Sequence, residues 1–152
     1  MKKIRLILLG ESMPSKRYFY DINTSYEDNG MRYNLKKEFD QSELTDVQFF
    51  QSFRRKGIVL HDCGFCPVHK LNSNTEKRNA ATFCLLTQNI EFLHSTPEIP
   101  IITIFPFNRG WLKKEVPDSI KDRIIAEFSF NKIKGIKDLY NEIKSKDHDN
   151  TK

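Results

Sequence analysis

Near its N-terminus the chain carries an almost continuously apolar run, Ile4-Arg5-Leu6-Ile7-Leu8-Leu9, which ends at Gly10. A strand with one face in water would alternate apolar and polar residues. A continuous apolar run is instead typical of a strand covered on both faces, as in a parallel sheet. We therefore expect a buried strand over residues 4–9. Glycine, proline and asparagine residues, which favour turns, recur in the segment that follows. Their presence predicts a long loop over residues 10–30.

Further strands are predicted where the same kind of apolar segment recurs. Residues 58–62 and 101–105 are short and apolar, and a fourth strand is expected near residues 126–130. Helical patterns separate these segments, and two begin with the capping-box sequences Thr45-Asp46-Val47-Gln48 and Ser73-Asn74-Thr75-Glu76. Helices are predicted at 31–39, from 45 to Gly57, from 73 through Leu93, from Asp118 through Ile125, and from Ile136 through Ile143.

This alternation of strands and helices, without hairpin signals, predicts parallel strands joined by helical crossovers. We expect an α/β fold, a three-layer αβα sandwich with a short, mainly parallel four-stranded sheet. Residues 1–146 are predicted to form a single domain and residues 147–152 a polar tail. In the longest helix, the face expected to meet the core carries Ala80, Phe83, Leu86, Ile90 and Leu93.

The composition of the chain limits the kinds of binding partner that we expect. The 152 residues carry a net charge of +5, which favours polyanionic partners such as DNA or nucleotides. No stretch approaches the roughly 20 apolar residues that a membrane helix needs, so no membrane partner is expected. Three cysteines and no secretory signal predict a reducing, cytoplasmic location.

Ligands of such sheets bind beyond the carboxyl ends of the strands, which directs attention to residues 10–20, 61–69 and 105–111. In the first of these segments, Glu11 or Ser12 could position a water molecule. Lys16 and Arg17 could hold a phosphate, and Phe19 or Tyr20 could stack on a base. The alternative is a loop whose aromatic side chains pack back on the sheet. Trp111 beside Arg109 could form a second stacking surface, or seat the next helix.

The same residues resemble a known family. Gly10-Glu11-Ser12, then Pro14 and Arg17-Tyr18-Phe19-Tyr20, resemble the first motif of uracil-DNA-glycosylase-like proteins. The segment Leu60-His61-Asp62-Cys63, leading to Pro67-Val68 and Lys70-Leu71, is similar to the matching segment of small members of that superfamily. The resemblance covers residues 4–71. It implies a three-layer αβα fold with a base-binding pocket at the strand ends.

The resemblance also implies roles for individual residues. Glu11 and Asp62 would be the catalytic carboxylates of a DNA glycosylase, which hydrolyses the N-glycosidic bond of a flipped or single-stranded damaged base. Base and nucleic-acid contacts would come from Gly10, Ser12, Lys16, Arg17, Phe19 and Asn131. The chain departs from the family pattern at Ser12, where a carboxylate is usual, and at Asp62, where asparagine reads uracil. The closing histidine is missing near Asn131. These departures favour a non-catalytic nucleic-acid or nucleotide-binding module on the same fold as the alternative.

A third hypothesis rests on Cys63 and Cys66, a Cys-x2-Cys pair flanked by His61 and His69. These side chains suit zinc, but four ligands within nine residues cannot easily surround one tetrahedral ion. A redox dithiol is the other functional interpretation, and packing of a turn is the simplest one. We expect no metal and no other cofactor.

Overall fold

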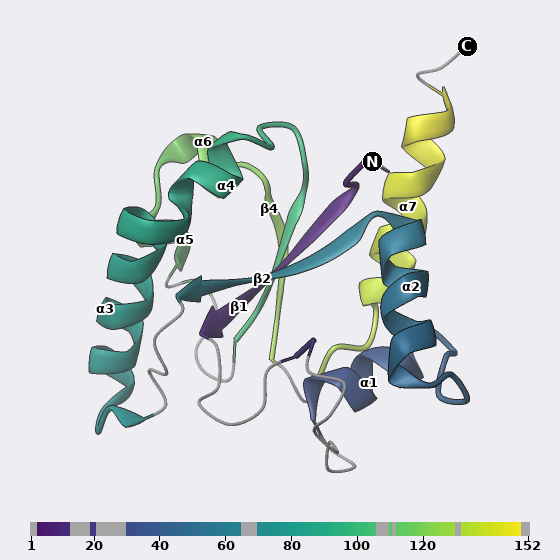
Figure 1. Ribbon diagram of the computed structural model, residues 1–152. Coiled ribbons are helices and arrows are strands. Elements are labelled where there is room, and N and C mark those ends of the chain that lie inside the picture. Colours follow the sequence, from purple (N-terminus) through teal and green to yellow (C-terminus); the bar gives the residue numbers. More distant parts are fainter. Residues whose placement is uncertain are drawn as a thin grey trace.

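The computed structural model describes residues 3–12, 19–20, 30–64, 70–105, 110, 112–129 and 132–149. Four parallel strands form one sheet with helices on both faces (Figure 1), in the order β2-β1-β3-β4. This confirms the predicted α/β class and the parallel pairing of the three apolar strands. The strands are β1 (Leu6–Ser12), β2 (Ile58–Gly64), β3 (Ile101–Ile104) and β4 (Ile124–Phe128).

The helices form two layers, one on each face of the sheet (Figure 1). One layer contains α1 (Met31–Glu38), α2 (Asp46–Lys56) and α7 (Ile136–Asp149). The other contains α3 (Asn74–Cys84), the π-helix η2 (Leu85–Asn89), α4 (Ile90–His94), α5 (Leu112–Glu115) and α6 (Asp118–Lys121). The last helix, α7, continues into the segment predicted as a polar tail. No helix of the described ranges is long and apolar enough to cross a membrane.

Strand β1 lies between the two layers and explains the apolar run that begins the chain. Leu6 and Leu8 belong to the core cluster under α1, α2 and α7, whereas Ile7 and Leu9 belong to the cluster under α3 to α6. All four side chains are 0% exposed. Because successive side chains of a strand point to opposite faces, a strand covered on both faces requires apolar residues at every position.

The capping boxes and the glycine predicted from the sequence lie at the ends of the helices. Both capping boxes form: the Thr45 and Ser73 side chains each accept from the backbone N–H three residues on, and Gln48 and Glu76 each accept from the capping residue. Gly57 ends α2 with a φ of 74°, a conformation that favours glycine. A Cβ at this position would lie 2.4 Å from the Lys3 carbonyl oxygen, so both the turn and the packing require glycine.

Leu93 is buried and Ile90 packs against the core, as predicted, but earlier along the longest helix the predicted core face is wrong by about one position. Ala81, Cys84 and Leu85 are buried there, whereas Phe83 is 65% exposed. The π-helix η2 then changes the helical period, and the polar Asn89 is buried in place of an apolar residue. The predicted helix through Ile125 is also shorter: α6 ends at Lys121 because Ile124 already pairs with Ile101 in the sheet.

One buried cation ties the α1–α2 layer together. The Arg32 side chain is 1% exposed, and its Nε donates to the Phe19 carbonyl oxygen at 3.1 Å. Its Nη1 forms a salt bridge with Asp46, in the first turn of α2. Its guanidinium carbon lies 5.0 Å from the centre of the Phe50 ring. Arg32 therefore holds the backbone of residue 19 against two helices.

Replacing this cation with an apolar side chain of similar length should destabilise the fold. We expect Arg32→Met to lower the free energy of unfolding by about 3 kcal/mol, because it leaves buried acceptors without a donor. The matched control is Arg55→Met, at an exposed position of α2, which should change stability by less than about 0.5 kcal/mol. Urea denaturation measures both. Equal effects of the two substitutions would contradict the role assigned to Arg32.

Candidate functional site

The candidate site lies at the carboxyl ends of β1 and β2. The register aligns Gly10 with Asp62 and Ser12 with Gly64. Strand β1 therefore continues to Ser12, through residues that are predicted to belong to a loop. Glu11 is a strand residue, and the direction of its side chain is governed by the pleat of the sheet.

The pleat separates the two carboxylates that were expected to share one pocket. Asp62 lies on the face of Leu60 and Leu8, toward α1 and α2, whereas Glu11 lies on the opposite face, toward α3. The sheet therefore does not bring Glu11 and Asp62 together in one pocket, contrary to the prediction. Asp62 instead lies beside Gly10, its partner in the register of the two strands.

Gly10 makes room for the Asp62 carboxyl group. A Cβ built on Gly10 would lie 2.3 Å from Asp62 Oδ1, so the carboxyl oxygen covers the glycine Cα directly. Burial raises the pKa of Asp62 from its usual 3.8 to about 6. A carboxyl group with such a pKa exchanges between an acceptor-only anion and an acid with one O–H donor close to neutral pH.

The opposite face of the strand ends carries a second polar group of side chains. Burial raises the pKa of Glu11, and the positive charges of Lys77 and Arg78 on α3 partly oppose that shift. Burial lowers the pKa of His61, whose ring centre lies 4.3 Å from that of Phe92. This face therefore presents a half-buried carboxyl group near two cations and a histidine biased toward its neutral form.

Asn89 connects the helical layer to the strand end. Its Nδ2 donates to the Cys63 carbonyl oxygen at 2.8 Å, and a hydrogen bond between the His61 and Asn89 side chains opposes the lowering of the His61 pKa. No pattern in the sequence predicts a role for Asn89, Lys77 or Arg78. Polar residues surround Asn89 in the sequence, among them Thr87 and Gln88, so no local signal distinguishes the buried one.

The remaining predicted site residues fall into two groups. Phe19 is 5% exposed and packs against Tyr20, Phe49 and Phe50, with ring centres 4.9, 6.5 and 5.5 Å away. The ring is a core residue and is not available to stack on a base, which corrects that prediction in favour of the packed loop. Lys16, Arg17 and Asn131 lie outside the described residues, as do Arg109 and Trp111, and Ser12 is placed only by its backbone in β1.

The cysteine hypothesis gains no support from Cys63. Its side chain is fully buried, and burial raises the pKa of its thiol well above the usual value. A thiol that resists ionisation is a poor nucleophile and a poor metal ligand. Cys66 and His69 lie outside the described residues. Among the residues that are described, no group of three or more His, Cys, Asp or Glu side chains could hold a metal ion.

Comparison with known proteins finds no relative of this chain: no family model, curated protein or solved structure matches it.

The contact between Gly10 and Asp62 can be tested with a double-mutant cycle. Gly10→Ala should destabilise the protein by about 1–3 kcal/mol, because the added methyl group collides with the carboxyl oxygen. In an Asp62→Ala background the collision is absent, and Gly10→Ala should cost less than about 0.5 kcal/mol. Unfolding free energies of the four proteins give the coupling. Additive effects would show that the two side chains do not compete for the same space.

The buried carboxyl group should also make stability depend on pH. Since its folded pKa of about 6 exceeds its usual 3.8, the charged form opposes folding above pH 6, and the penalty disappears below pH 4. Asp62→Asn should therefore be more stable than the parent at pH 8, by up to about 3 kcal/mol, and equally stable at pH 3.5. Denaturation at several pH values measures the difference. A constant difference would contradict the raised pKa.

Proposed function

We propose that this protein binds a nucleobase, within DNA or a nucleotide, at the carboxyl ends of β1 and β2. The observation that carries the proposal is the Asp62 carboxyl group, held over Gly10 with a pKa of about 6. Such a group can accept a hydrogen bond from an exocyclic amino group when charged, and donate one to a carbonyl oxygen when protonated. The net charge of +5 supports a polyanionic partner.

The resemblance to uracil-DNA-glycosylase-like proteins supports the same place in the fold. In that resemblance, the segments that contain Gly10 and Asp62 form the base-binding pocket. Asp62 stands where asparagine reads uracil, so above pH 6 its charged carboxylate would repel the carbonyl oxygens of uracil. We therefore expect a preference for a base that presents donors, such as cytosine or adenine, at alkaline pH.

Glu11 supports a second candidate function, hydrolysis of the N-glycosidic bond. In that reaction water attacks C1′ of the sugar, the base departs with the electrons of the broken bond, and a general base accepts a proton from the water. Burial raises the pKa of Glu11, and a raised pKa makes its carboxylate a stronger base. Because Glu11 and Asp62 lie on opposite faces of the sheet, binding is the function that the geometry supports better.

Base binding is tested with labelled single-stranded oligonucleotides that differ only at one central base, either cytosine or uracil. Fluorescence anisotropy at pH 8 should give tighter binding of the cytosine strand. Lowering the pH to 5 should favour uracil, by about tenfold relative to cytosine, because protonated Asp62 becomes a donor. Asp62→Asn should remove this pH dependence. Affinities that are independent of both base and pH would contradict the assignment of Asp62.

Hydrolysis is tested on the same strands, extended to hypoxanthine and xanthine, by alkaline cleavage at abasic sites. If Glu11 is the general base, Glu11→Gln should lower the rate by at least about 100-fold. The control is Glu43→Gln, at an exposed position, which should leave the rate unchanged. Base-dependent binding without abasic sites would identify a non-catalytic module.

A further inference from the structure

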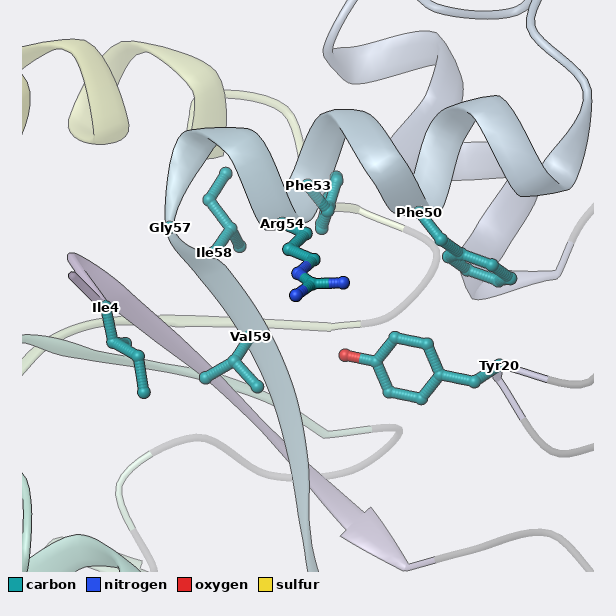
Figure 2. Close-up of a pocket in the computed structure, with 8 residues that line it drawn as sticks. All are labelled: Ile4, Tyr20, Phe50, Phe53, Arg54, Gly57, Ile58 and Val59. Atoms are coloured by element: carbon teal, nitrogen blue, oxygen red, sulfur yellow. The ribbon is translucent and has the colours of Figure 1, made fainter. Parts of the chain in front are cut away.

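A second hollow lies on the free edge of β2, toward the amino end of the strand and away from Asp62. It is a cavity of about 260 Å³ between β2 and α2 (Figure 2). Its apolar floor is the edge of β2, lined from the two faces of the sheet: Ile58 lies on the α2 side, and Ile4 and Val59 lie on the opposite side. The Phe50 ring lies on the side of α2. For scale, a cavity of roughly 150 Å³ lined by apolar side chains holds benzene. This cavity therefore has room for a bicyclic aromatic ring.

The side of the cavity formed by Tyr20 is held in place by the strand edge. The Leu60 N–H donates to the Tyr20 hydroxyl oxygen at 2.9 Å, and the hydroxyl donates to the Leu60 carbonyl oxygen at 3.3 Å. The Tyr20 ring packs on Phe50, with ring centres 5.2 Å apart. Two hydrogen bonds and one ring contact thus keep the aromatic wall in position without a ligand, as pre-formed binding sites require.

The positively charged side chain of Arg54 lies at the opening of the cavity. Figure 2 shows the Arg54 guanidinium directed across the apolar floor toward the Tyr20 hydroxyl. The Arg54 side chain makes no hydrogen bond or salt bridge within the part of the chain that the structure describes. A guanidinium beside an apolar cavity is complementary to a ligand that joins an apolar body to an anionic group.

The surroundings of Arg54 increase the positive potential. Arg55 and Lys56 follow it in the last turn of α2. Burial lowers the pKa of Lys56, and the positive charges of Arg55 and Lys144 lower it further. Asp147, the acidic residue of α7 near this end of the sheet, already pairs with Lys3 and Arg5. The excess of cations favours an anionic ligand over a neutral one.

We infer that this cavity binds a small aromatic carboxylate. Its ring would lie on the floor formed by Ile58 and Val59, against the Phe50 and Tyr20 rings, and its carboxylate would pair with Arg54. The apolar walls account for the ring, and the Arg54 guanidinium, which has no partner among the described residues, accounts for the charge. This site is separate from the one proposed around Asp62, and neither depends on the other.

The experiment uses the whole chain with labelled isoleucine and valine methyl groups. Indole-3-carboxylate is titrated while methyl NMR spectra are recorded, and the neutral indole-3-carboxaldehyde is titrated in parallel. We expect the carboxylate to shift the Ile58 and Val59 methyl signals and to bind at least fivefold more tightly than the aldehyde. Arg54→Met should weaken the carboxylate about tenfold. Arg55→Met removes only long-range positive charge, because Arg55 does not line the cavity, and should weaken binding by less than about threefold.

Several outcomes would overturn this assignment. These are equal affinity for the carboxylate and the aldehyde, equal effects of the two arginine substitutions, and no shift of the Ile58 and Val59 signals at 10 mM ligand. Tighter binding of a mononucleotide than of the carboxylate, still dependent on Arg54, would also overturn it in favour of a phosphate site. Asp62→Asn should leave carboxylate binding unchanged, which separates this result from the test of base binding.

Discussion

The burial of β1 between two helical layers is the constraint on which the other elements depend. Its four apolar side chains supply both core clusters, two on each face, and it pairs with β2 on one side and β3 on the other. Each buried side chain of this size contributes about 1.5–3 kcal/mol of hydrophobic stabilisation. Among the described strands, β1 therefore places two fully buried apolar side chains in each core cluster.

Both sites that we propose use β2, the strand at one edge of the sheet. At its carboxyl end Asp62 is held over Gly10, where a side chain on β1 would leave no space. At its amino end, the edge not paired with β1 faces the Tyr20 hydroxyl and the cavity below α2. A central strand has neighbouring strands on both edges. An edge strand has backbone N–H and C=O groups on its outer edge that can form hydrogen bonds with side chains or ligands.

The structure buries the ionisable side chains of Asp62 and Arg32, and burial of a charged group has a free-energy cost. The raised pKa of Asp62 means that its charged form opposes folding, so a buried apolar residue would suit stability better. Arg32 is different, because its hydrogen bond to the Phe19 carbonyl oxygen and its salt bridge to Asp46 offset its burial. One buried ionic group thus supports the fold, while the other is a candidate for function.

The sequence by itself determined the features that arise within a few residues. Continuous apolar runs predicted the parallel strands, and the Thr45 and Ser73 capping boxes predicted two helix starts, because hydrogen bonds over three residues are local. Only the tertiary structure decided which side chains meet. The faces of Glu11 and Asp62 depend on where β1 ends, and a shift of one residue reverses every side chain. The burial of Phe19 and the exposure of Phe83 depend in the same way on packing between elements distant in the chain, which no local pattern contains.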